Sequence, residues 1–219
     1  MRILITGGSG LLGKYLVPLL KAQDGDGNLF ERVFVESPTH KELDITKEIK
    51  KKDYDLIIHA AAYTDVLGAE KYKEDCSKVN IHGTENLLKT YFNVPFVFIS
   101  SEYAKNPTNF YASTKAIGEL FTHLWAENYL VIRTLFKPTP FPWDKAFVDQ
   151  YTQGDYVDVI AKLIIKEIFK WHFSKDRKSK DIYVGTRRKT MYDLAKRTRE
   201  VRPISVKDIK KVKIPTDYL

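Results

Sequence analysis

Near its N-terminus the sequence reads Arg2-Ile3-Leu4-Ile5-Thr6-Gly7-Gly8-Ser9-Gly10-Leu11-Leu12-Gly13. Its first five residues predict a buried strand, and the apolar residues after the glycines are spaced for one face of a helix. Three of the glycines have G-x-x-G-x-x-G spacing, which gives a tight turn and lets backbone approach a diphosphate closely. Because a helix N-terminus attracts anions, the stretch predicts a dinucleotide site that includes Gly7, Ser9, Gly10, Leu11, Leu12 and Gly13.

Short apolar segments alternate with helical patterns as far as residue 135. We expect strands at 2–6, 32–35, 55–59, 95–100 and 129–133, and helices at 11–19, 77–91 and 110–126. Pro18 lies inside the first helix and should kink it. Several strands are apolar on both faces, as a parallel sheet covered by helices on each side requires. The alternation therefore predicts an α/β fold, a doubly wound parallel sheet of the Rossmann type.

The pattern changes after residue 135. Phe136–Trp143 contains three prolines in eight residues, which argues against a helix or a central strand. Helical spacing returns at 156–169 and at 190–201, where Thr190 is a candidate N-cap, and the tail at 213–217 should be extended. We expect residues 1–135 to form the dinucleotide-binding domain. Residues 136–219 should form a small substrate-binding lobe, partly interleaved with that domain.

Composition excludes several classes of protein. Of the 219 residues, 43% are hydrophobic and 29% charged, which argues against a disordered chain. No apolar run approaches the roughly 18 residues of a membrane span, and the N-terminal residues lack the layout of a signal peptide. A single cysteine, Cys76, rules out an internal disulfide and a cysteine-rich metal site. We therefore expect a cytoplasmic protein with no membrane partner.

The charge balance favours an anionic ligand. There are 36 Lys and Arg against 28 Asp and Glu, for a net charge of +8. The basic runs at 175–180, 187–189 and 207–213 lack the interleaved aromatic residues of an RNA-binding sheet, and we interpret them as a solvated face. The expected partner is therefore a nucleotide-containing small molecule, and not a nucleic acid.

The end of the second predicted strand leaves the cofactor open. Glu36 stands where an acid usually binds the adenosine ribose hydroxyls of NAD. The hydroxyl and basic groups that follow it, Ser37, His40 and Lys41, would instead suit the 2′-phosphate of NADP, although His40 also fits an ordinary surface loop. Both NAD and NADP stay open, with the balance slightly toward NADP.

A second chemical signal is Tyr111-Ala112-Ser113-Thr114-Lys115, which places a phenol and an ammonium one helical turn apart. A nearby cation stabilises a phenolate, and so lowers the pKa of the tyrosine toward neutrality. Ser100 and Ser101 stand at the C-terminal end of the strand predicted before this helix, at the sheet edge where α/β proteins bind ligands. A serine hydroxyl there can hydrogen-bond a substrate carbonyl. These three residues, Ser101, Tyr111 and Lys115, are the predicted catalytic group.

Taken together, these motifs resemble an extended short-chain dehydrogenase/reductase, and within that superfamily the dTDP-4-dehydrorhamnose reductase group of sugar-nucleotide-binding proteins. The resemblance covers most of residues 1–135. It rests on the glycine turn, the Tyr-x-x-x-Lys pair with Gly118-Glu119, and the segments Leu43–Thr46, Asp55–Val66, Val79–Thr84, Ile99–Tyr103 and Val131–Thr134. It implies reduction, with NAD(P)H, of the C4 ketone of a nucleotide-activated 4-keto-6-deoxy sugar. It also makes a homodimer an expectation, because dimers are common in the superfamily.

The resemblance also implies roles for single residues. Asp44 and Ile45 would contact the adenine, and the cofactor's ribose and nicotinamide would meet Ala60, Ala61, Ala62 and Tyr63. Asn80 would support the active-site helix. Ser101 would polarise the ketone, Tyr111 would donate the proton and Lys115 would hold the nicotinamide ribose. The substrate contacts would be Thr64, Glu102 and Tyr103. Two of these residues have structural alternatives, since Asp44 could cap a helix and Asn80 could satisfy buried backbone.

Two departures from the family keep other functions open. Only nine residues, Glu102–Phe110, separate Ser101 from Tyr111, where family members usually have a longer loop that helps to cover the substrate. Glu102 also replaces the usual aspartate, and the chain is short for the extended class. One alternative is a non-catalytic, dinucleotide-binding regulatory subunit, as in methionine adenosyltransferase. Another is a nucleotide-sugar epimerase or dehydratase.

Overall fold

A computed structural model describes residues 1–22, 33–209 and 216 of the chain. Its centre is a six-stranded parallel sheet with the strand order β10-β5-β4-β3-β1-β2. The strands are β1 (Arg2–Thr6), β2 (Phe34–Glu36), β3 (Leu56–His59), β4 (Phe96–Ser101), β5 (Tyr129–Thr134) and β10 (Lys180–Tyr183). The order reverses between β1 and β3, which is the point where sheets of this kind bind ligands.

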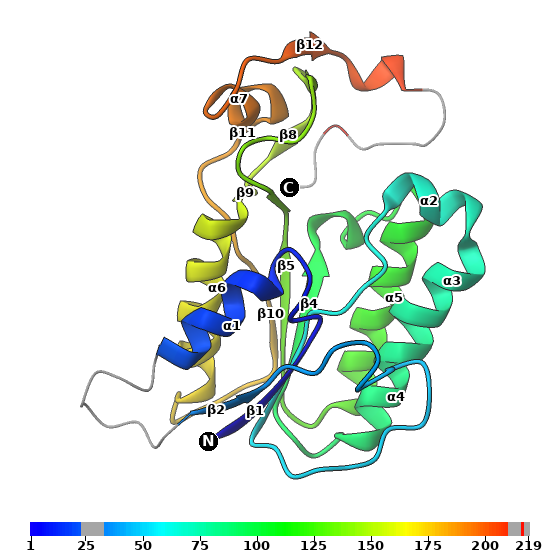
Figure 1. Cartoon of the computed structure of the whole chain (residues 1–219), viewed down its shortest axis with the longest axis vertical. Coiled ribbons are helices and arrows are strands. Elements are labelled where there is room, and N and C mark those ends of the chain that lie inside the picture. Colours follow the sequence, from blue (N-terminus) through cyan, green and yellow to red (C-terminus); the bar gives the residue numbers. More distant parts are fainter. Residues whose placement is uncertain (23–32, 210–215, 217–219) are drawn as a thin grey trace.

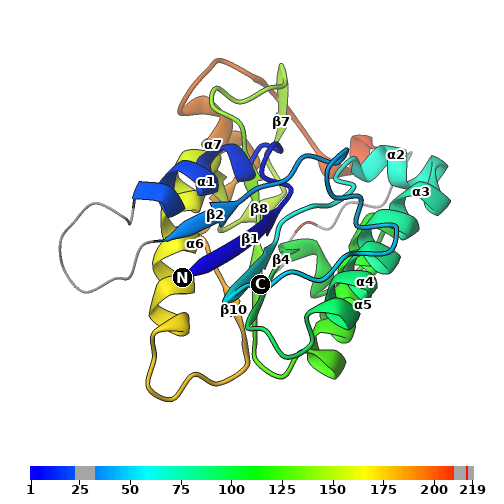
Figure 2. The same cartoon turned by 60° about the horizontal axis from the view of Figure 1, so that its bottom comes forward.

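Helices cover both faces of the sheet (Figures 1 and 2). One face is covered by α1 (Gly13–Lys21) and α6 (Val157–His172). The other face carries α2 (Val66–Lys71), α3 (Lys73–Ser77), α4 (Gly83–Thr90) and α5 (Phe110–Trp125). Alternate residues of a strand point to opposite layers, so Val97 packs with the α1–α6 layer while Phe96 and Phe98 pack with the α4–α5 layer. The doubly wound Rossmann-type fold predicted from the sequence is confirmed.

Four of the predicted strands lie within one residue of the observed strands. β1 coincides with its predicted range, and β3, β4 and β5 lie within one residue of theirs. β2 begins at Phe34, and residue 32 of its predicted range lies outside the described residues. β10 was missed, because the edge strand Lys180-Asp181-Ile182-Tyr183 pairs only with β5 and carries mostly polar side chains. An edge strand that is largely open to water lacks the apolar pattern on which strand prediction depends.

The predicted helices differ from the observed ones mainly in their interiors. The single helix expected at 77–91 is divided, since α3 passes through a π-helical turn (Lys78–His82) into α4. The kink expected at Pro18 does not divide α1, which continues to Lys21. Thr190 caps α7 (Met191–Lys196) in a capping box with Asp193, as its residue type predicted, although α7 ends before the predicted residue 201.

A small lobe lies beyond the carboxyl ends of the strands (Figure 1). It contains α7 and three short pairs, which join β6 (Phe136–Lys137) to β9 (Asp155–Tyr156), β7 (Lys145–Phe147) to β12 (Arg202–Ile204), and β8 (Tyr151–Thr152) to β11 (Lys189–Thr190). The apolar core of the lobe contains Leu135, Phe141, Tyr156, Met191 and Leu194. Two short 3₁₀ turns complete the described elements, Glu102–Ala104 directly after β4 and Val206–Asp208 after β12.

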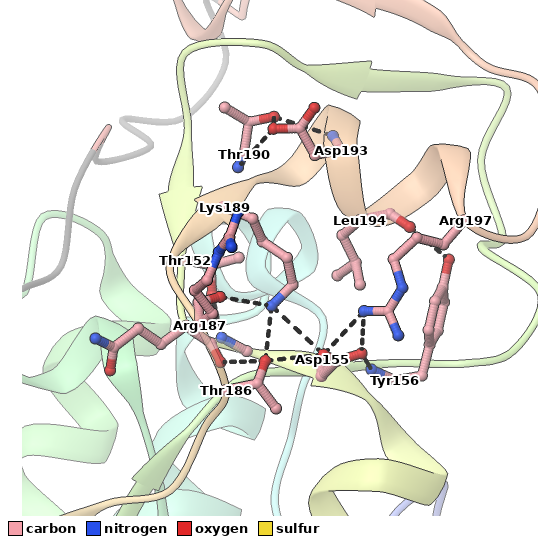
Figure 3. Close-up of polar contacts among 12 residues, drawn as sticks. Thr152, Asp155, Tyr156, Thr186, Arg187, Lys189, Thr190, Asp193, Leu194 and Arg197 are labelled. Atoms are coloured by element: carbon pink, nitrogen blue, oxygen red, sulfur yellow. Dashed lines mark hydrogen bonds and ion pairs between the residues drawn. The ribbon is translucent and has the colours of Figure 1, made fainter.

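A buried carboxylate fastens the lobe together (Figure 3). Asp155 is 4% exposed, and both of its oxygens accept from Nη1 of Arg197, at 2.8 and 2.9 Å. Thr186 donates to the same carboxylate at 2.8 Å, and the Lys189 ammonium lies 3.5 Å from it while donating to Thr186. Asp155 belongs to β9, Thr186 and Lys189 precede α7, and Arg197 follows it. The network therefore ties β9 to the segments before and after α7.

Two further expectations concern the outer parts of the chain. The tail predicted to be extended, 213–217, lies outside the described residues except for Thr216, whose carbonyl accepts from the Tyr151 backbone at 2.8 Å. Across the part of the chain that the structure describes, no helix combines the length and the apolar character needed to cross a membrane.

Candidate active site

A cavity of about 550 Å³ opens at the carboxyl ends of β1, β3, β4 and β5. Its walls are the glycine turn after β1, the loops after β2 and β3, the ends of β4 and β5, and part of the segment that enters the lobe. Several segments that are distant in sequence therefore meet at one edge of the sheet. All six turn residues predicted to hold a cofactor line this cavity: Gly7, Ser9, Gly10, Leu11, Leu12 and Gly13.

Two glycines of the turn after β1 lie in close contact with neighbouring backbone. Gly7 has a φ of +75°, and a Cβ there would lie 2.5 Å from the backbone nitrogen of Ala61. A Cβ on Gly13 would lie 2.2 Å from the carbonyl oxygen of Gly7. The turn is closed by a hydrogen bond from the Gly10 backbone to the Gly7 carbonyl at 3.0 Å. Only glycine fits at both contacts, so the turn packs closely on the backbone after β3 and leaves the start of α1 at the cavity, a position that suits an anion.

The structure does not bring Glu36 to the cavity wall. Its carboxylate accepts from Tyr54 at 2.6 Å, from Arg2 at 2.8 Å and from Lys52 at 3.1 Å. These hydrogen bonds, that from Tyr54 foremost, lower the pKa of Glu36 to about 2. The partners come from β1 and from the loop before β3, so sequence proximity to the glycine turn could not reveal them. The acid at the end of β2 is thus occupied by protein groups.

The other residues after β2 divide into two groups. His40 lines the cavity, together with Pro38 and Thr46. Ser37 and Lys41 are not part of the wall. The Ser37 hydroxyl lies against Gly8, where an added Cβ would come within 1.8 Å of it, and Lys41 is exposed.

Asp44 caps no helix, because the residues that follow it form a turn. Its carboxylate accepts from the backbone and the hydroxyl of Thr46, at 3.0 and 2.7 Å, and these bonds lower its pKa to about 2. Asp44 is therefore outside the wall, while its neighbour Ile45 lines the cavity. The residues expected at the ribose and nicotinamide, Ala60, Ala61 and Ala62, line the cavity as well.

Asn80 fixes the loop after β3 from the π-helical turn. It is 1% exposed, its Oδ1 accepts from the Tyr63 backbone at 2.7 Å, and its Nδ2 donates to the Tyr63 carbonyl at 3.1 Å. Nδ2 also donates to the Thr114 hydroxyl of α5 at 2.9 Å. Asn80 and Tyr63 lie outside the wall. Asn80 thus acts on buried backbone and links the loop to the helix that carries Tyr111.

His59, to which the sequence motifs gave no role of its own, supports the floor of the site. Its ring lies between the hydroxyls of Thr6, 2.7 Å from Nδ1, and Thr84, 3.0 Å from Nε2. Thr84 gives its proton to the Asn80 carbonyl, so Nε2 of His59 is the donor to Thr84 and Nδ1 accepts from Thr6. Burial lowers the pKa of His59 to about 3. The ring is therefore neutral and holds the ends of β1 and β3 to α4.

The three predicted catalytic residues lie close to one another. Ser101 and Tyr111 line the cavity and are hydrogen-bonded to each other. Lys115 is 3% exposed behind the wall, where its Nζ donates to the Ile99 carbonyl at 2.8 Å and lies 4.2 Å from the centre of the Phe98 ring. Asn109 caps α5 by accepting from the Ala112 backbone at 2.9 Å, which fixes Tyr111 in the first turn.

The electrostatics of this group differ from the sequence-based expectation. Burial raises the pKa of Tyr111 to about 12, against the opposing effect of the hydrogen bond with Ser101. Burial also lowers the pKa of Lys115 to about 8. The Lys115 ammonium is directed to the Ile99 carbonyl and does not depress the phenol. Tyr111 is thus held protonated at neutral pH, which suits a proton donor more than a base.

The expected substrate contacts also separate. Thr64 and Tyr103 line the cavity, whereas Glu102 does not. The Glu102 carboxylate turns toward the lobe and accepts from the Thr152 hydroxyl at 2.9 and 3.0 Å and from the Tyr183 phenol. Burial raises its pKa to about 7. Glu102 therefore joins β4 to β8 and β10, directly behind Ser101.

The structure adds wall residues that the motifs did not indicate. Ser100 and Thr134 line the cavity, and their buried hydroxyls have no hydrogen-bond partner among the described residues. Lys137 and Trp143 close the wall on the lobe side. The place of Ser100 and Thr134 in the wall depends on the strand register, in which Ser101 of β4 lies opposite Thr134 of β5. A glycine-rich turn, a largely apolar wall and two hydroxyls without a partner among the described residues together fit a nicotinamide dinucleotide.

Comparison with known proteins agrees with this geometry. Over 140 residues the chain is 32% identical to an inverting UDP-N-acetylglucosamine 4,6-dehydratase of Campylobacter jejuni, which covers 53% of the chain and 41% of that enzyme. It is 35% identical over 100 residues to a 3-beta-hydroxysteroid dehydrogenase of Mycolicibacterium neoaurum, covering 40% of the chain and 27% of the relative. The matched regions thus span less than half of either relative.

Solved structures show the same fold over nearly the whole chain. A dTDP-4-dehydrorhamnose reductase from Clostridium acetobutylicum superposes with a TM-score of 0.82 at 23% identity, over 99% of this chain and 88% of that one. The corresponding reductase of Bacillus anthracis, solved with NADP, gives 0.77 at 22% identity, over 98% and 88%. Residues 1–216 also match the family described as the RmlD substrate binding domain. Because that match covers almost the full sequence, the chain belongs to the RmlD substrate binding domain family.

Proposed function

We propose that the protein reduces the C4 ketone of a nucleotide-activated 4-keto-6-deoxy sugar with NAD(P)H, as an oxidoreductase of the short-chain dehydrogenase/reductase type. The observation that carries this proposal is that Ser101 and Tyr111 share one cavity wall with the glycine turn, while Lys115 is buried behind that wall, one helical turn from Tyr111. Family membership and the likeness to reductase structures support it. In this proposal residues 1–135 hold the cofactor and the lobe from residue 136 holds the substrate.

Each residue of the group has a separate task. Ser101 orients the ketone oxygen through its hydroxyl, and Tyr111 donates the proton that this oxygen needs as it becomes an alcohol. The raised pKa keeps that proton on Tyr111 until a stronger base develops on the substrate. Lys115 holds positive charge behind the wall and fixes the end of β4 through Ile99. A nicotinamide bound in this cavity would supply the hydride, with the diphosphate of the cofactor at the glycine turn.

We further propose a preference for NADP. An acidic side chain at the end of β2 selects NAD when it is free to accept ribose hydroxyls. Here the Glu36 carboxylate is hydrogen-bonded by Tyr54, Arg2 and Lys52, and the ionisable residue on that part of the wall is His40.

The cellular setting and the assembly also belong to the proposal. The free Cys76 thiol is buried, in keeping with the cytoplasm as the proposed setting, and a homodimer is the expected assembly.

The first test measures turnover by the unmodified protein and then by the variant Tyr111→Phe, which lacks one oxygen atom. Protein mixed with NADPH and dTDP-4-keto-6-deoxymannose should lose absorbance at 340 nm, and faster than with NADH. In the variant we expect turnover to fall by about 10²–10⁴-fold, because the proton donor is gone. Cofactor affinity, measured by titration calorimetry, should stay nearly unchanged. Absence of turnover by the unmodified protein with every 4-keto nucleotide sugar would refute the proposal.

One alternative has a specific observation in its favour. Only nine residues connect Ser101 to Tyr111, so little chain is available there to cover a substrate, as a non-catalytic, dinucleotide-binding regulatory subunit would allow. Tight NADP binding without turnover, together with co-purification of another enzyme, would support that function. An epimerase or dehydratase is less favoured, because the acid after Ser101 faces Thr152 and Tyr183 and not the cavity.

A further inference from the structure

The cavity wall contains no aspartate or glutamate among the residues that the structure describes. Its two basic side chains are His40, which follows β2, and Lys137, which follows β5. Four strand spacings separate β2 from β5 in the sheet, which is roughly 19 Å at about 4.8 Å per strand. Among the described residues, the cavity thus offers basic side chains at two well-separated places, one of which the cofactor proposal does not use.

Lys137 lies where the sheet passes into the lobe. It follows Thr134, the register partner of Ser101, by three residues, and in β6 it pairs with Tyr156 of β9. Its Nζ lies 4.9 Å from the centre of the Trp143 ring. Trp143 also lines the cavity, with 51% of its surface exposed. Lys137 is therefore held at the wall by an aromatic ring that is open to a ligand.

No carboxylate within the described residues comes within 4.0 Å of the Lys137 ammonium, and none of their atoms accepts a hydrogen bond from it. The adjoining wall residues Leu135, Phe136 and Pro138 are apolar. An ammonium in such surroundings is unfavourable unless an anion accompanies it. The arrangement therefore favours a negatively charged ligand group at this position.

The nearest compensating charge cannot take that position. Burial lowers the pKa of Lys137 to about 8, and the Glu102 carboxylate opposes this lowering. The Lys137 ammonium therefore stays protonated at neutral pH. The Glu102 carboxylate, however, is fixed by Thr152 and Tyr183 outside the cavity. The hydroxyl of Thr152 is directed to Glu102 because the Gly154 backbone donates to its oxygen at 2.7 Å. Glu102 thus balances Lys137 from behind and leaves its cavity side open.

We propose that Lys137 binds the diphosphate of a nucleoside-diphosphate substrate and so determines specificity for sugars activated in this way. The inference rests on the proposed function and assigns its second anion. The cofactor's own diphosphate belongs at the glycine turn after β1, three strand spacings from β5, or roughly 14 Å away. Lys137 lies on the lobe side, beside the exposed Trp143 ring, where a substrate nucleotide would extend from a sugar held at Ser101 and Tyr111.

The test is nucleotide binding, measured by titration calorimetry in the presence of saturating NADPH. The probes are dTDP and UDP, each compared with its nucleoside monophosphate. For Lys137→Gln we expect dTDP or UDP affinity to fall at least 10-fold, with a much smaller change for the monophosphate. Lys137→Met, which keeps the length of the stem, should behave alike. Lys162→Gln is the matched control, because Lys162 is exposed on α6, and it should bind like the unmodified protein.

The outcomes separate this inference from the proposed function. Diphosphate affinity that is unchanged in both Lys137 variants would overturn the inference and leave the reductase proposal standing. If the unmodified protein binds NADPH but neither diphosphate, both fail. A third arm compares UDP-glucuronate with UDP-glucose. Loss of discrimination between them in Lys137→Gln, with UDP binding unchanged, would assign the ammonium to a carboxylate of the sugar and would also overturn the diphosphate assignment.

Discussion

At the scale of single residues, the floor of the site depends on a chain of hydrogen bonds with a fixed direction. Thr6 donates to His59, His59 donates to Thr84, and Thr84 donates to the Asn80 carbonyl. The direction follows from Thr84, whose single proton is already used. A neutral, buried histidine in this position holds strand and helix together without introducing charge below the cavity.

Thr84→Val should therefore reduce the free energy of unfolding by about 1–3 kcal/mol, because it leaves the buried Nε2–H of His59 without an acceptor. Thr90→Val is the matched control, since Thr90 also donates to a carbonyl four residues earlier in α4 but has no histidine behind it. Urea denaturation of the two variants makes the comparison. Equal losses in the two would show that the His59 contact does not contribute.

Glu102 gives stability a pH dependence of defined sign. Its pKa is about 7 in the folded protein, where burial raises it from an ordinary value of 4.5. Between these two values the native state holds a proton that the unfolded chain releases, so stability should fall as pH rises from 4.5 to 7.

Glu102→Gln should remove this contribution. Relative to the variant, the unmodified protein should lose up to about 1.4 kcal/mol for each pH unit in that window. Urea denaturation at pH 5, 6 and 7 measures the difference, with Glu127→Gln at an exposed position as the control. A constant difference between the unmodified protein and Glu102→Gln across the window would contradict the prediction.

At the scale of elements, the glycine turn and α1 form one unit whose geometry excludes side chains. Gly13→Ala would place a Cβ 2.2 Å from the Gly7 oxygen and 2.4 Å from Gly8 Cα, both backbone atoms that cannot turn aside. We expect a loss of about 1–3 kcal/mol in stability together with loss of NADPH binding. At Gly10 the nearest atom to an added Cβ is 3.1 Å away. The variant Gly10→Ala should therefore be clearly more stable than Gly13→Ala. Thermal unfolding without cofactor compares the two variants.

The elements also show what local sequence could and could not predict. The spacing of Gly7, Gly10 and Gly13 and of Tyr111 and Lys115 is local, so the turn and the helical pair were predicted directly. Glu36 was assigned to the ribose from its place at the end of the second strand. Its actual partners, Arg2, Lys52 and Tyr54, lie on segments that only the fold brings together. The wall residues Ser100, Thr134 and Lys137 depend on strand register, which a single sequence does not state.

At the scale of the whole molecule, the lobe depends on Asp155. Asp155→Asn removes the charge on which Arg197, Lys189 and Thr186 converge, and we expect a loss of about 1.5–3 kcal/mol with faster proteolysis of the lobe. Asp144→Asn is the matched control, since Asp144 pairs with Arg202 in the same lobe but its side chain is 65% exposed, against 5% for Asp155. Limited proteolysis followed by mass spectrometry locates the opened segment, and equal cleavage of both variants would refute the prediction.

The path of the chain through the sheet has one further consequence. The polypeptide leaves the sheet at β5, builds part of the lobe, and returns through α6 and β10 to complete the edge beside β5. A fragment cut after residue 135 would keep every glycine of the turn after β1 and the whole Tyr111 helix. It would nonetheless present β5 with a bare row of amide and carbonyl groups and uncover the apolar side chains that α6 shields, a template for self-association. Residues 1–135 are thus a region of the molecule and not an excisable module.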